Sequence, residues 1–179
     1  YATSWRTRLF PSIEWMAYFF SSTPFWFKRL LNGRIINSGL SRILGLTETP
    51  HLSELSLRKS MRKLQVSYAK PVLLENNHAA NIVVIVLDMF TAFYHTEVVI
   101  SCMEVLRSMN VSCYIMPFLP SGKSAKSVGD LKSFKSYAQR FVRELVHLNK
   151  MNPAIQFICI EPSIALFFRS DYKEYGMLG

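Results

Sequence analysis

The stretch "NIVVIVLD", Asn81 to Asp88, decides the fold of this chain. A strand with one face in water alternates apolar and polar residues, whereas this run is aliphatic without interruption from Ile82 to Leu87. Such runs, rich in β-branched residues, are typical of strands buried on both faces, which occur in parallel sheets covered by helices. The stretch therefore predicts an α/β domain built on a small parallel sheet.

Strand and helix patterns alternate after this run. The expected elements are a helix at 98–109 that ends at Asn110, a strand at 111–118 ("VSCYIMPF"), a helix at 131–148, a strand at 154–161 ("AIQFICIE") and a helix opening at 163–168. This order predicts right-handed βαβ crossovers with helices on both faces of the sheet.

The part before the strand has a different pattern. Helical patterns from Trp5 to Leu64 are interrupted by prolines and glycines, which predicts short helices joined by turns, the last of them from Ser53 to Leu64. Residues 68–81 are expected to be a linker. We therefore divide the chain into a helical, aromatic and basic connector at 1–75 and an α/β domain at 76–179. Because the first residue is Tyr1, we expect the chain to be a piece of a longer protein.

The net charge of +9 is concentrated in the connector, where eleven Lys and Arg face four Asp and Glu. A basic region suggests nucleic acid, an anionic membrane or an acidic domain. The cations are scattered and no zinc-finger or RRM signature is present, so we expect no nucleic-acid partner. The uncharged stretch Trp15 to Phe27 is too short to span a bilayer and contains Pro24. It is expected to pack on another protein surface or, less favourably, to lie at a membrane surface.

Three cysteines, Cys102, Cys113 and Cys159, lie in apolar segments and share no CxxC spacing. This pattern predicts buried free thiols in a reducing compartment, and hence a cytoplasmic protein, with a peripheral place at the inner face of the membrane as the alternative. The scattered cysteines and histidines predict no metal site.

Ligands of parallel sheets bind at the carboxyl ends of the strands. Candidate ligand-binding residues at these ends are Asp88, Thr91, Lys123, Lys126, Glu161 and Ser163. The two lysines could hold an anion at the start of the following helix, or could be solvated. The two carboxylates could form a pair with raised pKa, or could cap their own turns.

No set of nucleophile, base and orienting group is recognisable, so we expect no catalytic residues in this chain. The tripeptide Gly122-Lys123-Ser124 matches only the end of a phosphate-binding GxxxxGK[ST] loop, because Pro117 stands where the first glycine is required.

Three strand-end motifs carry a family resemblance. "DMFTAFYHTEVV" resembles the "DTFTNYY…E" stretch of FAD-linked 2-hydroxy acid dehydrogenases that carry iron-sulfur modules, closest to the D-2-hydroxyglutarate and D-lactate dehydrogenase branch. "EPSIALFFRSDY" is similar to their "EPSC…RDEY" ending, and Gly122 and Gly129 keep the glycine spacing of their cysteine-rich CCG domain. The resemblance implies that this chain is a C-terminal module of such an enzyme, with FAD-binding and ferredoxin-like modules upstream as partners and with FAD and 4Fe-4S clusters in the parent protein.

The resemblance fails at the cluster cysteines. Pro120 and Ser121 stand at the cysteine pair before Gly122, Ile164 stands at the cysteine of EPSC, and Met89 lies where relatives have another cysteine. Clusters are held by thiolates, so the chain is expected to carry no cluster or other cofactor of its own.

Three functions follow from these observations. The first is a non-catalytic module that completes the fold or assembly of the parent oxidoreductase. The second is an independent module that binds a small anionic or polar ligand at the strand ends. The third is a peripheral membrane-surface adaptor acting through Trp5 to Leu31. Self-association through the aromatic N-terminal segment is also expected.

Overall fold

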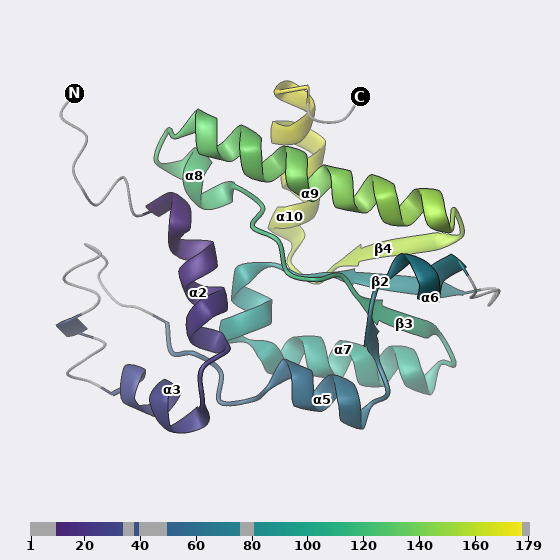
Figure 1. Ribbon diagram of the computed structural model, residues 1–179, viewed down its shortest axis with the longest axis horizontal. Helices are drawn as coiled ribbons and strands as arrows, with labels where there is room; N and C mark the ends of the chain where they lie inside the picture. The colour runs from purple at the N-terminus through teal and green to yellow at the C-terminus, as the bar shows by residue number, and fades with distance from the viewer. Residues whose placement is uncertain (1–9, 34–37, 40–49, 76–80, 177–179) are drawn as a thin grey trace.

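The computed structural model describes residues 10–33, 38–39, 50–75 and 81–176. These residues form a four-stranded, all-parallel sheet with helices on both faces (Figure 1). The strand order is β1-β3-β2-β4. The strands are β1 (Ser67–Tyr68), β2 (Ile82–Val86), β3 (Ser112–Ile115) and β4 (Ile155–Cys159). The predicted α/β fold class and parallel sheet are confirmed.

Strand β2 lies in the middle of the sheet and is buried on both faces. Ile82, Val84 and Val86 pack in one core cluster with α9 (Leu131–Met151). Ile85, with Leu87 just after the strand, packs in a second cluster with α7 (Thr96–Ser108). No residue of β2 is more than 7% exposed. The two-sided burial explains why the sequence of this strand is aliphatic without alternation.

The long helices begin and end close to the predicted positions. The Asp130 side chain caps α9 by accepting a hydrogen bond from the Ser133 N–H at 3.0 Å. After α7, Asn110 adopts a left-handed conformation with φ of 56°, which stops the helix as predicted. The remaining elements of this half are a π-helical turn η2 (Phe90–Tyr94), α8 (Lys123–Ser127), α10 (Pro162–Phe167) and the π-helical turn η3 (Phe168–Tyr172).

The N-terminal half contains short helices, as predicted, and also one strand of the sheet. Its helical elements are η1 (Phe10–Ser12), α2 (Ile13–Ser21), α3 (Phe25–Leu31), α5 (Leu57–Lys63) and α6 (Pro71–Glu75). Strand β1 pairs with β3, with Ser67 opposite Tyr114. Figure 1 shows α5 beside α7 and α2 at the carboxyl end of the sheet. These residues therefore lie against the α/β core and share its sheet.

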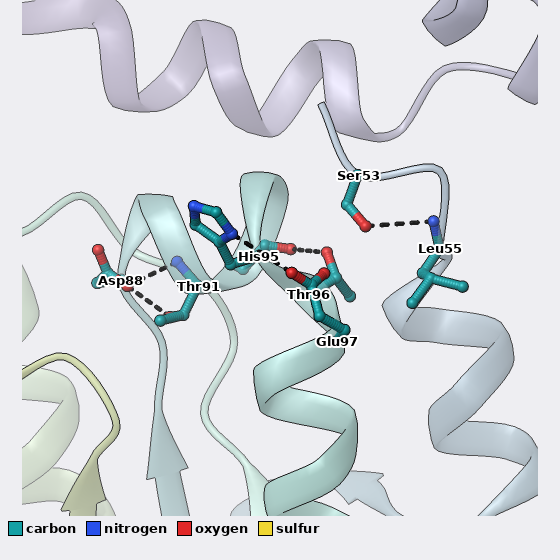
Figure 2. Close-up of polar contacts among 8 residues, drawn as sticks. Ser53, Leu55, Asp88, Thr91, His95, Thr96 and Glu97 are labelled. Carbon is teal, nitrogen blue, oxygen red and sulfur yellow. Dashed lines mark hydrogen bonds and ion pairs between the residues drawn. The ribbon is translucent and has the colours of Figure 1, made fainter. Parts of the chain in front are cut away.

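Two local expectations in this half are wrong. Residues 68–81, expected to be a linker, include the end of β1 and all of α6. A two-residue strand leaves no alternation to detect, and Pro71 opens α6 at a position where a missing N–H is harmless. The helix expected from Ser53 starts at Leu57, because Ser56 rather than Ser53 caps it. The Ser53 hydroxyl instead accepts from the Leu55 N–H at 3.2 Å (Figure 2).

Among the described residues, none of the helices is both long enough and apolar enough to cross a membrane. The stretch Trp15 to Phe27 is divided between α2 and α3. Trp5, where the proposed membrane-binding segment begins, lies outside the described residues.

Candidate functional site

The carboxyl edge of the sheet brings together three loops, one after each long strand. In Figure 1 this edge faces α2 and the start of α8. All predicted ligand-binding residues except Lys126 lie in these loops or at the first residues beyond them. Lys126 lies one turn into α8.

The loop after β2 is held by its own carboxylate. Asp88, only 5% exposed, accepts hydrogen bonds from the Phe90 N–H at 3.0 Å and the Thr91 N–H at 2.9 Å. The Thr91 hydroxyl adds a third bond at 2.5 Å (Figure 2). These bonds start the π-helical turn η2, so Asp88 has the capping role that was one of its two sequence-based interpretations.

Next to this turn, His95 precedes α7 at the surface. Its Nδ1 lies 3.3 Å from the Glu97 carboxylate, and both side chains are more than half exposed (Figure 2). The Thr96 hydroxyl donates back to the Ala92 carbonyl at 2.9 Å. His95 thus stands at the N-cap position of α7, and its ring contacts a carboxylate.

The loop after β4 is also closed locally. The Glu161 side chain caps α10 by accepting from the Ser163 N–H at 3.2 Å, and hydrogen bonds from Ser163 hold the pKa of Glu161 below its usual value. The hypothesis that Asp88 and Glu161 form a carboxylate pair with raised pKa is therefore wrong for Glu161. The reason is that hydrogen bonds to the charged form outweigh the effect of burial.

The loop after β3, residues 117–124, is here called the β3 loop. Gly122 has φ of 85°, and a Cβ added to it would lie 3.1 Å from both a ring carbon and the carbonyl oxygen of Phe134. Gly129 has φ of 77° and ends α8 before the Asp130 cap. Both glycines therefore adopt backbone conformations that other residues rarely adopt.

A residue that the sequence did not identify holds the β3 loop. Glu14, from α2, accepts hydrogen bonds from the Ser121 N–H at 2.7 Å, the Ser121 hydroxyl at 3.3 Å and the Ser124 N–H at 3.3 Å. Glu14 is 4% exposed although it carries a carboxylate. The available signal was that it is the single acidic residue among the first 47 of the chain.

The C-terminal segment holds the same loop from another direction. The Tyr172 hydroxyl donates to the Ser121 carbonyl at 2.6 Å, and Lys123 Nζ donates to the Ser163 hydroxyl at 2.5 Å. Burial and the charge of Glu14 raise the pKa of Tyr172 above its usual value, so the phenol remains a donor. The structure thus brings together Ser121, Lys123 and Ser163 from the predicted set.

The ammonium group of Lys126 contacts other residues of the chain. Its ammonium forms an ion pair with Asp171 and lies 5.2 Å from the ring centre of Tyr175 and 5.8 Å from that of Phe167. Ion pairing and cation–π attraction both satisfy this charge. Anion binding by Lys123 and Lys126 stays a prediction, but both ammonium groups already have partners in the chain.

The positions matched to cluster ligands do not fit a cluster. Pro120, Ser121 and Ile164 are buried and Met89 is half-buried, and none of them supplies a thiolate. The single polar side chain among them, Ser121, is bonded to Glu14 and accepts from the Lys123 N–H. Within the described ranges, no group of three His, Cys, Asp or Glu could hold a metal ion. The donor chemistry of the β3 loop is therefore that of oxygen and backbone nitrogen.

The cysteines are unpaired, as predicted, but half-buried rather than buried. Each packs at the margin of a core cluster and not inside it. Burial raises the pKa of all three thiols, and burial together with the nearby Cys102 raises the pKa of Cys113 to about 12. For Cys159, the charge of Asp88 adds to the effect of burial.

Three curated proteins are similar to this chain, and all three are D-2-hydroxyglutarate dehydrogenases. The Haemophilus influenzae protein is 28% identical over 144 residues, which cover 79% of this chain and 14% of the relative. The Escherichia coli protein is 24% identical over 171 residues, covering 94% and 17%. The Pantoea ananatis protein is 24% identical over 139 residues, covering 76% and 13%.

The chain thus spans 13–17% of the length of these relatives. No family model matches the chain, and no solved structure matches it. The names of the relatives agree with the resemblance to 2-hydroxy acid dehydrogenases that the strand-end motifs indicated, and the chain is similar to one small part of such enzymes.

Proposed function

We propose that this chain is a non-catalytic module of a FAD- and iron-sulfur-dependent D-2-hydroxy acid dehydrogenase, with a structural or assembly role and with no cluster of its own. The observation that carries the proposal is the coverage of the alignments. They extend over most of this chain but over only 13–17% of each dehydrogenase. The partners in this proposal are the FAD-binding and ferredoxin-like modules of the parent protein, in the cytoplasm.

The chemistry of the carboxyl edge supports a structural role. The β3 loop is bonded to Glu14 of α2 and to Tyr172 of η3 through Ser121. Its Lys123 donates to the Ser163 hydroxyl of α10. In the part of the chain that the structure describes, every buried side-chain nitrogen and oxygen has a hydrogen-bond partner. A module whose polar groups are satisfied internally is suited to stability rather than to substrate turnover.

A structural role of the module predicts that damage to it lowers the yield of assembled enzyme and leaves the oxidation rate per flavin unchanged. In the parent protein, Val84→Asp is expected to unfold the module, because Val84 is 0% exposed, and Val105→Asp, at a position 56% exposed on α7, is its matched control. We expect Val84→Asp to reduce the yield of assembled enzyme, while the enzyme that remains oxidises D-2-hydroxyglutarate at the normal rate per flavin with an artificial electron acceptor. A strongly reduced rate per flavin in Ser121→Ala or Lys123→Met would contradict a non-catalytic role. A parent protein without flavin would contradict the assignment to a FAD-dependent dehydrogenase.

Exposed apolar side chains on α2 and α3 are the candidate contact with the other modules. Phe19 on α2 and Trp26 on α3 are each 67% exposed, and Leu30 on α3 is 51% exposed. Large apolar side chains that are exposed in number mark protein or membrane contacts. We propose that these side chains meet the upstream modules, or a second copy of the chain when those modules are missing.

The test is a double variant, Phe19→Ser with Trp26→Ser, against Leu166→Ser, a control at an exposed residue of α10. Analytical ultracentrifugation of the 179-residue chain should show self-association that only the double variant abolishes. Identical monomers in all three proteins, with equal binding to the upstream modules, would rule out this contact. Salt-sensitive flotation of the wild type with anionic liposomes would instead support the membrane-adaptor function.

A further inference from the structure

Helix α2 lies across the carboxyl edge of the sheet and contacts two of its loops (Figure 1). The Tyr18 ring stacks on Phe118 of the β3 loop, with centroids 5.7 Å apart and an interplanar angle of 11°. It also meets Phe93 of η2 edge-on at 5.9 Å. One turn earlier, Glu14 bonds to Ser121 and Ser124. The helix therefore occupies the place where parallel sheets bind their ligands.

Glu14 is a buried carboxylate held by neutral donors. The ion pairs formed among the described residues are His95–Glu97 and Lys126–Asp171, and Glu14 belongs to neither. A buried carboxylate is costly unless hydrogen bonds replace its water, and backbone N–H groups form strong bonds to carboxylates. The attachment of Glu14 therefore depends on the two N–H groups of the β3 loop.

Apart from Glu14, α2 is attached by the ring contacts of Tyr18 and by Ala17 and Phe20, which pack on one core cluster. Glu14 and Ala17 are the residues of the helix that are buried, whereas Tyr18 is 43% exposed and Phe19 is 67% exposed. Segments with few buried apolar contacts open at a lower free energy than the whole domain unfolds. Breaking the bonds of Glu14 should thus release α2 while the sheet stays folded.

We propose that α2 is a strap that closes the carboxyl edge of the sheet, and that the Glu14 carboxylate is its pin, serving as the chain's own oxyanion ligand for the β3 loop. When the pin is withdrawn, the N–H groups of Ser121 and Ser124 and the ring of Phe118 become accessible at the edge. This inference is independent of the proposed enzyme family, because it uses only contacts within the chain.

The test is hydrogen–deuterium exchange of the 179-residue chain with mass spectrometry. Glu14→Ala removes the pin, Glu14→Gln keeps its shape without the charge, and Glu104→Gln at an exposed position of α7 is the control. Losing a hydrogen bond to a charged group corresponds to about a 10- to 100-fold faster opening. Peptides covering 10–24 and 118–127 should exchange faster by that factor in Glu14→Ala and in the same direction in Glu14→Gln, while peptides covering β2 and β4 are unchanged.

Sodium acetate distinguishes the pin from ordinary packing. Acetate can replace the missing carboxylate without being joined to α2, so in Glu14→Ala it should slow exchange at 118–127 and leave 10–24 fast. Sodium chloride at the same ionic strength is the control. Wild-type exchange at 118–127 in both Glu14 variants would overturn the proposal. Equal acceleration in β2 and β4 would also overturn it, as would an acetate effect no larger than that of chloride.

Discussion

The loops after β2 and β3 end at the same edge of the sheet but are held in opposite ways. Asp88 binds the N–H groups of residues two and three positions later, so the β2 loop closes on itself. The β3 loop is held by Glu14, 107 residues before Ser121, and by Tyr172, 51 residues after it. One loop is fixed by local sequence, whereas the other depends on both ends of the chain having folded onto it.

This difference predicts different consequences of damage. A substitution of Asp88 should disturb one turn, because the groups that donate to its carboxylate lie in that turn. A substitution among the partners of the β3 loop should also loosen α2 or the α10–η3 segment, since the same bonds join these segments to the sheet.

The largest effect is expected where both loops lose their support. Val84→Asp places a carboxylate at a residue that is 0% exposed in the middle of the sheet. An unpaired buried carboxylate costs several kcal/mol, about as much as the whole stability of a small domain. Circular dichroism should show an unfolded α/β half for Val84→Asp and native melting for Val105→Asp. Native melting of both variants would show that the sheet is wrongly assigned.

The next effect concerns the β3 loop. Tyr172→Phe removes the hydroxyl that donates to the Ser121 carbonyl and leaves that buried carbonyl unpaired. We expect a loss of about 1–3 kcal/mol in the free energy of unfolding, measured in urea. Tyr18→Phe, which keeps the stacked ring, is the control and should change stability little. If both substitutions cost the same, the hydroxyl of Tyr172 is not what holds the loop.

A smaller and more local effect is expected in the β2 loop. Asp88→Asn keeps one oxygen acceptor for the turn, and asparagine caps about as well as aspartate, so the cost should be roughly 1 kcal/mol or less. Hydrogen exchange should change only around 88–95. Faster exchange at 118–127 in this variant would show that the two loops are coupled and would remove the contrast between them.

The smallest effect is on thiol chemistry. Because the pKa values of the three cysteines are raised, their thiols are protonated at neutral pH and should react slowly with an alkylating reagent. The rate should rise with pH toward the pKa of each thiol, last for Cys113, whose pKa is about 12. Asp88→Asn removes a nearby negative charge and should make Cys159 react faster than in the wild type. Rapid labelling of all three at pH 7, or a disulfide between any two, would contradict their half-buried, unpaired state.

The parts of the fold that could be predicted are those with a local pattern. The aliphatic run of β2, the apolar face of α9 and the stop at Asn110 each depend on neighbours within a few residues. Strand β1 could not be found, because two residues show no alternation and its partner strand lies more than 40 residues away.

The same limit applies to the site. The loops after β2 and β4 were correctly placed, since Asp88 and Glu161 cap turns within three residues. Glu14 was missed because nothing near it in the sequence indicates a partner at Ser121. The engagement of Lys126 by Asp171 and three aromatic rings likewise depends on the folding back of the C-terminal segment.

We propose that the β3 loop, which accepts and donates hydrogen bonds within the chain, holds no metal cluster. The direct measurement is iron and acid-labile sulfide content, with the visible absorption spectrum, after anaerobic reconstitution of the purified 179-residue chain with iron and sulfide. We expect a colourless protein without stoichiometric iron, whose exchange protection at 118–127 is the same before and after reconstitution. A broad visible absorption with stoichiometric iron and sulfide would contradict it.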